Sequence, residues 1–181
     1  IAHKTYQGNL TPEYIRQSHN HEVTDMAGKK VKTPESKKRK RYLFKVTIVG
    51  PEDAILEKVL LVVNQSAVAV DGIRIGTTNV ETKDSKVRAV TWSPRHSALD
   101  VLLDVTYSGA NAVVIVLKDT DPEIEAIYRE EICEHLGSGT PTRILTVGSD
   151  IDEFKRHEIL NMFEELFQEV LDSKNKDSES E

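Results

Sequence analysis

The sequence predicts an α/β domain of three layers, in which helices cover both faces of a mostly parallel sheet with one antiparallel edge strand. Apolar, β-branched stretches alternate with helical patterns along most of the chain, which is typical of this class. One connection, Glu81–Ser85, is shorter than the roughly a dozen residues that a parallel crossover needs. The two strands that it joins therefore form an antiparallel hairpin, and a receiver-like fold, which needs a helix at that point, is disfavoured.

The first half of the domain begins with a buried strand over Tyr42–Val49, which ends at Gly50-Pro51. Acidic residues directly after Pro51 favour a helix that runs to about Val63, because carboxylates stabilise the amino-terminal turn of a helix. Two more strands, over Val68–Val80 and Lys86–Trp92, form the hairpin.

The second half continues the alternation. Asp121 before Pro122 and Gly137 after Leu136 are the residues expected at the start and end of a helix. Apolar side chains also recur at helical spacing near the carboxyl end. The expected elements are a helix over Ser97–Tyr107, a central strand over Ala112–Leu117, a helix over Pro122–Leu136, a strand over Arg143–Val147 and an amphipathic helix over Asp152–Leu171.

Charge divides the chain into three parts. Residues 1–45 carry eleven Lys and Arg against four Asp and Glu, whereas the remainder has a net charge of −13. We expect residues 1–41 to be a basic, largely disordered arm, 42–171 to be the domain, and 172–181 to be an acidic disordered tail. The single cysteine, Cys133, excludes a disulfide scaffold and is expected to be buried. With no apolar run of about 20 residues, a cytoplasmic location is the expectation.

Two segments carry a family resemblance. The segment Gly76–Thr82 (GTTNVET) is similar to the Arf segment IGFNVET, and Val87–Trp92 resembles the strand that ends in W-D-x-x-G. With the order of elements, they make Arg41–Leu171 resemble the small GTPases, particularly the Arf and Rab branches. The resemblance implies a small-GTPase-like sheet that lacks one strand–helix unit, since a single helix follows Arg143–Val147. Val49–Ala54 also resembles centromere protein M, a GTPase-like protein without nucleotide, over too few residues to imply a role.

The phosphate loop of that family, G-x-x-x-x-G-K-[ST], is degenerate here. Its glycines let backbone amides wrap the phosphates, its lysine neutralises their charge, and its hydroxyl holds Mg²⁺. Gly50 keeps the first position, but Ile55, Leu56 and Glu57 stand at the last three. Glu52 and Asp53 add two carboxylates. We therefore expect a pocket filled by its own acids, with no nucleotide.

The other family positions also depart from the pattern. Ser93 replaces the metal-linked aspartate, and His96 replaces the glycine of W-D-x-x-G. Arg74 stands near the place of the switch threonine. Of the guanine-reading N-K-x-D only Asp150 is left as a vestigial base contact, and a cap of the last helix by Asp150 or Asp152 is the simpler interpretation.

These departures favour a catalytically inactive small-GTPase-like domain, a pseudo-GTPase without cofactor or metal that acts as a protein-interaction adaptor or assembly subunit. The alternative is a divergent Arf/Rab-like switch that binds GTP or GDP with magnesium. The resemblance places the partner surface on the hairpin and the segment after it. The candidate partner-binding residues are Arg74, Thr77, Thr78, Trp92, Arg95 and His96.

A basic run gives a second alternative, an electrostatic tether of the arm. It consists of Lys37, Lys38, Arg39, Lys40 and Arg41. Such a run suits an anionic membrane surface, which would make the protein peripheral at a membrane, or an import receptor or a plain solvated linker. Nucleic acid is disfavoured because neither aromatic residues nor glycines are interleaved with the cations.

Overall fold

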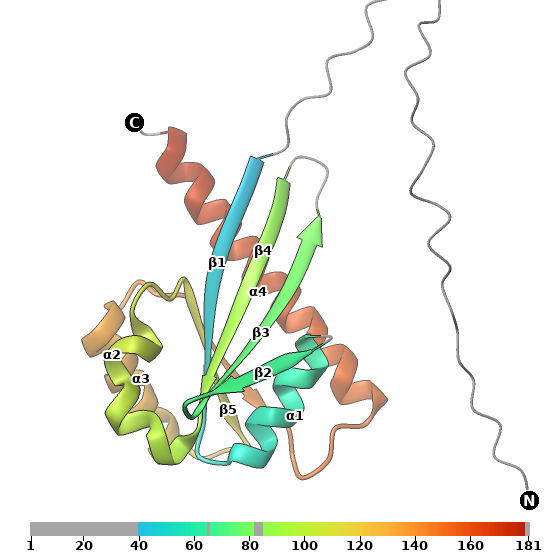
Figure 1. Cartoon of the computed structure of the whole chain (residues 1–181), viewed down its shortest axis with the longest axis vertical. Helices are drawn as coiled ribbons and strands as arrows, with labels where there is room; N and C mark the ends of the chain where they lie inside the picture. The colour runs from blue at the N-terminus through green and yellow to red at the C-terminus, as the bar shows by residue number, and fades with distance from the viewer. Residues whose placement is uncertain (1–39, 65, 82–84, 180–181) are drawn as a thin grey trace, which may run out of the picture. The chain divides into compact units, whose positions relative to one another are not determined.

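The structure is a computed structural model that describes residues 40–64, 66–81 and 85–179. The expectations for the arm, including those for Lys37, Lys38 and Arg39, lie outside these residues. Six strands and four α-helices follow one another in the described part, largely in the order that the sequence predicts (Figure 1).

One sheet contains all six described strands, in the order β2-β3-β4-β1-β5-β6. Strands β4, β1, β5 and β6 are mutually parallel, and β3 runs antiparallel to both β4 and β2. The predicted α/β class, with a mostly parallel sheet and an antiparallel edge, is confirmed. The strands are β1 (Lys40–Val49), β2 (Ala67–Val70), β3 (Ile73–Glu81), β4 (Ser85–Pro94), β5 (Ala112–Leu117) and β6 (Thr142–Thr146).

The antiparallel edge is a hairpin, which corrects the expectation of one strand over Val68–Val80. Asp71 and Gly72 have φ angles of 47° and 85° and reverse the chain between β2 and β3. Two successive positive φ angles define the tight turn whose twist matches a hairpin, and Asp-Gly is a preferred pair for it. The edge strand is therefore β2, and the antiparallel strand β3 lies inside the sheet.

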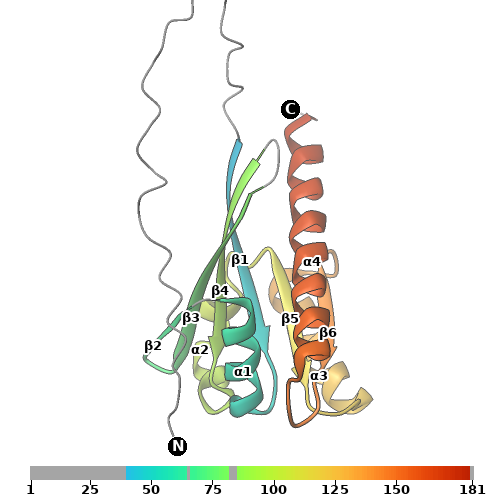
Figure 2. The same cartoon turned by 90° about the vertical axis from the view of Figure 1, so that its right-hand side faces the viewer.

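Helices cover both faces of the sheet, as the figures show from two sides (Figures 1 and 2). Helices α1 (Asp53–Val63) and α4 (Glu153–Glu179) pack on one face, with Phe44, Val46 and Ile48 of β1 beneath them. The other face carries the short helix η2 (His96–Ala98), α2 (Leu99–Tyr107) and α3 (Pro122–Leu136). All six residues of β5 are buried between these layers, as expected for a central strand.

The predicted boundaries change at both ends of the domain. Lys40 and Arg41, assigned from the sequence to the arm, are the first residues of β1. Helix α4 continues to Glu179, although residues 172–181 were expected to form a disordered tail. The Tyr42 hydroxyl donates a hydrogen bond of 2.6 Å to Asn175 Oδ1, which ties this extension to β1.

Two further observations concern α3 and the helices in general. Cys133 is exposed on α3, so the expectation that it is buried is wrong.

None of the described helices is long and apolar enough to cross a bilayer.

Candidate functional site

The place where this fold holds ligands is the edge formed by the carboxyl ends of the parallel strands. The chain leaves β1 toward β3 and β4, whereas it leaves the neighbouring β5 toward β6. Loops that diverge in this way open a crevice between them. The candidate site is therefore the junction between β1 and α1, together with the segments after β4 and β5.

Gly50, the first residue after β1, has a structural reason to be glycine. A Cβ atom at this position would lie 2.2 Å from the carbonyl oxygen of Val116 in β5, well inside van der Waals contact. The glycine therefore allows the junction to pack directly on β5. This close approach explains the residue without any phosphate.

Helix α1 begins at Asp53, inside the segment where a phosphate loop would still be open. The amides of Ile55 and Leu56 both donate to the carbonyl of Glu52, at 3.1 Å. The side chains of Ile55 and Leu56 are buried in the core under α1. These amides serve the first turn of the helix, so they are not available to surround an anion.

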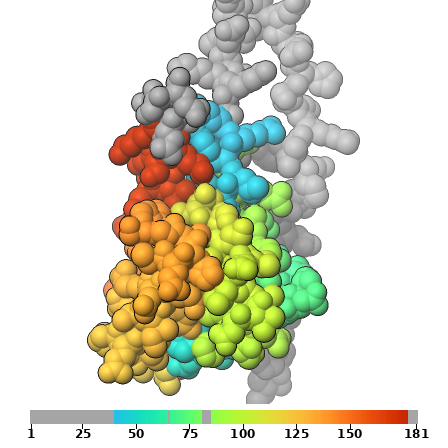
Figure 3. Space-filling view, turned by 90° about the vertical axis from the view of Figure 1, so that its left-hand side faces the viewer, coloured from blue at the N-terminus to red at the C-terminus, as the bar shows by residue number. Residues whose placement is uncertain are grey.

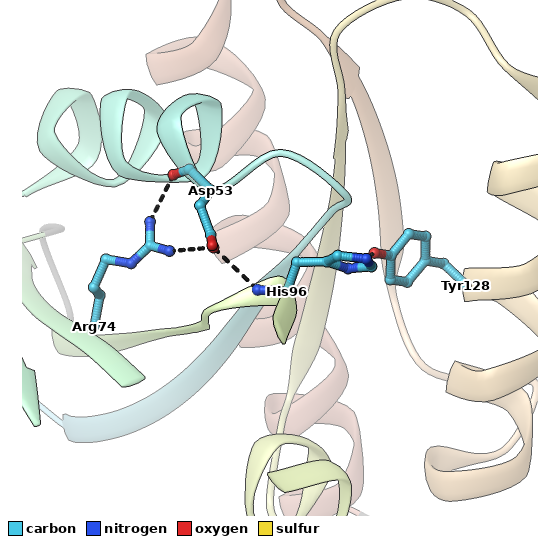
Figure 4. Close-up of polar contacts among 4 residues, drawn as sticks. All are labelled: Asp53, Arg74, His96 and Tyr128. Carbon is cyan, nitrogen blue, oxygen red and sulfur yellow. Dashed lines mark hydrogen bonds and ion pairs between the residues drawn. The ribbon is translucent and has the colours of Figure 1, made fainter. Parts of the chain in front are cut away.

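Asp53 is the centre of a polar network that joins three elements (Figure 4). Its carboxylate Oδ1 accepts hydrogen bonds from Arg74 Nη2 at 2.6 Å and from the His96 amide at 3.0 Å. Its backbone carbonyl accepts from Arg74 Nη1 at 2.8 Å. The Arg74 side chain, on β3, is only 7% exposed, whereas that of Asp53 is 44% exposed. A buried cation thus holds the first residue of α1.

The network continues to α3 through two rings. The Tyr128 hydroxyl lies 3.3 Å from His96 Nδ1. Burial raises the pKa of Tyr128 to about 12, and the nearby carboxylates of Glu131, Asp100 and Asp53 add to the rise. The phenol therefore keeps its proton at neutral pH, which suits a structural hydrogen bond rather than proton transfer.

The expectation that three acids fill the site is corrected by their positions. Glu52 is exposed and its side chain does not cap α1, and Glu57 lies on the exposed side of the helix. Only Asp53 turns inward, and it does so toward Arg74. The pocket is closed by an ion pair and by the first turn of the helix, not by a cluster of carboxylates.

The predicted partner-binding residues differ in how accessible they are in the structure. Arg74 is buried and bound to Asp53, so its side chain does not form part of an accessible partner surface. Thr77, Arg95 and His96 are exposed, whereas Thr78 and Trp92 are half-buried. Ser93, opposite Arg74 in the sheet, is completely buried.

Asp150 and Asp152 have different roles before α4. Asp152 Oδ1 accepts from the Lys155 amide at 2.7 Å, so the predicted cap of the last helix is Asp152. Asp150 is highly exposed and lies 3.3 Å from the Lys58 ammonium of α1. This contact links α1 to the loop after β6.

Sequence reasoning missed Lys45, although it is the one charged residue inside the predicted strand Tyr42–Val49. Its ammonium donates to the carbonyls of Val105 and Ser108, at 2.7 and 2.8 Å, at the carboxyl end of α2. It also lies 4.5 Å from the centre of the Trp92 ring. Burial lowers the pKa of this lysine. Lys45 therefore joins the carboxyl end of α2 to the sheet, and its ammonium is also stabilised by the Trp92 ring of β4.

A magnesium–triphosphate group does not fit the residues of the junction. The amides of Ile55 and Leu56 are used within the helix, and the inward carboxylate of Asp53 and the buried guanidinium of Arg74 satisfy each other, so neither is left to hold a metal ion or a phosphate. In the described segments no three His, Cys, Asp or Glu side chains come together as metal ligands do.

Comparison with models of known protein families and with curated protein sequences finds no match to this chain. Its activity has to be inferred from the closed junction and from the surfaces around it.

Proposed function

We propose that this chain is a small-GTPase-like domain that works without nucleotide, as a protein-interaction adaptor or assembly subunit. The observation that carries the proposal is the ion pair between Asp53 and Arg74, which occupies the junction where a nucleotide-binding relative would hold phosphate. Side chains of the domain itself thus close the junction between β1 and α1.

The order of elements supports the GTPase-like part of the proposal. A strand and helix are followed by an antiparallel hairpin and then by alternating helices and parallel strands. This is the order on which the resemblance to the Arf and Rab branches rests. After β6 the described chain has one helix and no further strand, which agrees with the missing strand–helix unit.

Electrostatics at the junction supports the absence of nucleotide. A phosphate placed at the start of α1 would compete with the Asp53 carboxylate, which is already paired with the buried Arg74 guanidinium. Separating the partners of such a pair is costly, because it leaves a buried charge without its counter-ion. That cost opposes the attraction that the amino terminus of a helix offers to an anion.

The same ion pair supports a constant partner surface. Arg74 joins β3 to α1, and the Asp53 carboxylate also accepts a hydrogen bond from the amide of His96, two residues after the end of β4. The hairpin and the segment that follows it are thereby fixed by contacts inside the protein. A switch needs two states that a ligand favours unequally. Here we expect one state, so the protein should bind its partner constitutively through Thr77, Trp92, Arg95 and His96.

Calorimetry with GTP, GDP and ATP in the presence of Mg²⁺ tests the nucleotide part of the proposal. We expect no heat of binding and no change in melting temperature. A ligand at 100 times its dissociation constant should stabilise the protein by about 2.7 kcal/mol, which a melting curve detects. Micromolar or tighter binding of a nucleotide would contradict the proposal and favour the alternative, a divergent GTP/GDP switch.

Pull-downs with the full chain test the adaptor part. They are run in GTP, in GDP and in EDTA, with wild-type protein and with Arg95→Glu, which changes an exposed side chain after β4. We expect the same bound proteins in all three conditions and a loss of binding in the variant. Partners that bind only with GTP would show that the surface is switched.

A further inference from the structure

Part of the sheet is left open on the side of α2 and α3. These helices lie over the carboxyl-terminal halves of β1 and β4, and on this side of the sheet none of the described helices lies over the amino-terminal halves, which α4 covers from the other side (Figure 1). The Lys45 ammonium, bonded to the last carbonyls of α2, marks where the helical cover ends. Figure 3 shows β1, in blue, at the surface above α2 and α3.

The residues of this region follow from the register. Leu43 of β1 is paired with Arg88 of β4, which is paired with Asn79 of β3. In the next row Val90 of β4 is paired with Thr77 of β3. Paired residues point to the same side of a sheet, as does every second residue along a strand. We call this set, with Arg41 of β1 and its partner Lys86 of β4, the open sheet face: Arg41, Leu43, Thr77, Asn79, Lys86, Arg88 and Val90.

On the opposite side of the sheet, the same strands are packed against the core. Phe44, Val87 and Ala89, which alternate with residues of the open sheet face, are buried in the core. The side chain of Leu43, by contrast, is 67% exposed. Strands that are packed against the core on one side therefore present an apolar side chain between arginines on the other, and these strands do not have to be ordered on binding.

Charge selects the partner. Residues 40–181 carry 26 Asp and Glu against 16 Lys and Arg, so the body of the protein is strongly acidic. Among the side chains that the structure describes on the open sheet face, the charged ones are the cations Arg41, Lys86 and Arg88, and all three are exposed. A complementary partner has carboxylates for these guanidiniums, which form bidentate bonds to carboxylate. It also has an apolar side chain to cover Leu43.

Other occupants fit less well. The run Lys37–Lys40, which precedes Arg41 in the sequence, is itself basic, so its charges cannot neutralise the arginines. Nucleic acids and anionic membranes spread phosphates over an area larger than this basic patch, so most of their charges would meet the acidic body, whereas a short segment needs only a few carboxylates at the arginines. Nucleic acids would also place a phosphate backbone against the apolar side chain of Leu43.

We propose that the open sheet face binds an acidic, apolar segment of another protein. Carboxylates of the segment bond to Arg41 and Arg88, and an apolar side chain packs on Leu43 and Val90. This inference rests on the proposed adaptor function and extends its partner surface from the end of β4 across to β1.

Selection from a phage library of random dodecapeptides on the full chain tests the proposal. We expect enriched peptides that combine Asp or Glu with Leu, Ile or Phe. Synthetic peptides of the enriched sequences should bind Arg41→Glu/Arg88→Glu at least about tenfold more weakly than wild type, because two attractions become repulsions. Leu43→Ser should weaken binding as well, and added salt should do so in the wild type.

Matched control variants test whether weaker peptide binding comes from the loss of any positive charge or any apolar side chain, wherever it lies on the surface. Arg156→Glu and Phe154→Ser change exposed residues of α4, away from the open sheet face, and should bind the peptides as the wild type does. Because all substituted side chains are exposed, thermal melting should show that every variant is folded. Three results would overturn the proposal: no enriched peptide, enriched peptides that are basic, or equal binding to the Arg41→Glu/Arg88→Glu variant.

Two further measurements separate the competing occupants. The first measures binding of duplex RNA and of vesicles containing phosphatidylserine. If either binds more tightly than the peptides, and if that binding depends on Arg41 and Arg88, the partner is a polyanion and not a protein segment. Sedimentation that shows a dimer disrupted by Leu43→Ser would make the occupant a second copy. Peptides that depend on Arg95 but not on Leu43 would leave the adaptor function intact and overturn only this inference.

Discussion

Arg74 Nη2 and Asp53 Oδ1 lie 2.6 Å apart and join the sheet to the first residue of α1. The pair is asymmetric, because the arginine side chain is 7% exposed and the aspartate side chain is 44% exposed. Removing the aspartate leaves a buried guanidinium without its counter-ion, whereas removing the arginine leaves a carboxylate that water can reach. The two deletions should therefore differ in cost.

Asp53→Ala is expected to lower the free energy of unfolding by about 3 kcal/mol, at the lower end for a broken buried pair because the aspartate is partly exposed. Arg74→Leu should cost about 1 kcal/mol, since an apolar side chain of similar reach replaces the buried cation. The double variant should be more stable than Asp53→Ala alone. Urea unfolding of the four proteins measures this cycle, and strictly additive losses would show that the pair contributes no coupling.

Gly50→Ala is expected to lower the free energy of unfolding by about 2–3 kcal/mol. The added Cβ would lie 2.2 Å from the backbone oxygen of Val116, so β5 or the junction would have to move. Gly139→Ala is the matched control, because nothing lies within 4 Å of a Cβ at that glycine. It should change stability by less than about 0.5 kcal/mol. Equal melting temperatures for the two variants would contradict the close contact.

Leu56→Ala is expected to cost about 3 kcal/mol in unfolding free energy, because its side chain is 1% exposed in the core. Leu61→Ala, on the same helix with a side chain that is 51% exposed, should cost less than about 1 kcal/mol. Denaturant unfolding of the two variants measures the difference. Similar small losses would mean that Leu56 is not a core residue, and a position open to ligand would then be possible at the junction.

The sequence predicted the elements with regular patterns. The apolar strand before Gly50-Pro51 and the helix from Pro122 to Leu136 lie where predicted, because the signals for them are local. The turn at Asp71-Gly72 was missed, although this pair is a strong local signal, because Val68–Val80 was taken as one apolar run. The continuation of α4 to Glu179 was missed because its polar composition hides a tertiary contact between Tyr42 and Asn175.

For the candidate site, the sequence predicts which residue types are present but not how their side chains are arranged. That Ile55, Leu56 and Glu57 cannot act as the glycine, lysine and hydroxyl of a phosphate loop is visible in the sequence. The burial of Arg74 is not, because it depends on how β3 meets the start of α1, more than twenty residues away along the chain. A charged residue in an apolar strand, as at Arg74 and Lys45, is the signal that could have found both contacts.

The titration of Tyr128 makes the free energy of unfolding fall as the pH rises in the alkaline range. Its pKa is raised to about 12 in the folded protein, from an ordinary value of 10, mainly by burial. Above pH 10 the unfolded chain loses this proton while the folded protein keeps it, so rising pH favours unfolding. The stabilisation is complete below pH 10 and declines as the pH rises to about 12. By pH 11 the loss should reach about 1.4 kcal/mol, the value of one pKa unit.

Tyr128→Phe removes this dependence, because phenylalanine has no proton to lose in either state. The variant also lacks the hydrogen bond of 3.3 Å to His96, so it should be slightly less stable than the wild type at pH 8. Between pH 9 and 11 the wild type should lose stability faster, until the two proteins become equal or change order. Tyr107, whose pKa is raised mainly by burial, titrates in both proteins, and because Tyr128 contributes the smallest part of that rise, Tyr107 largely cancels in the comparison. Urea unfolding at each pH measures the two slopes. Parallel slopes would show that Tyr128 does not titrate differently in the folded and unfolded states, and that the ring is more open to water than its 4% exposure indicates.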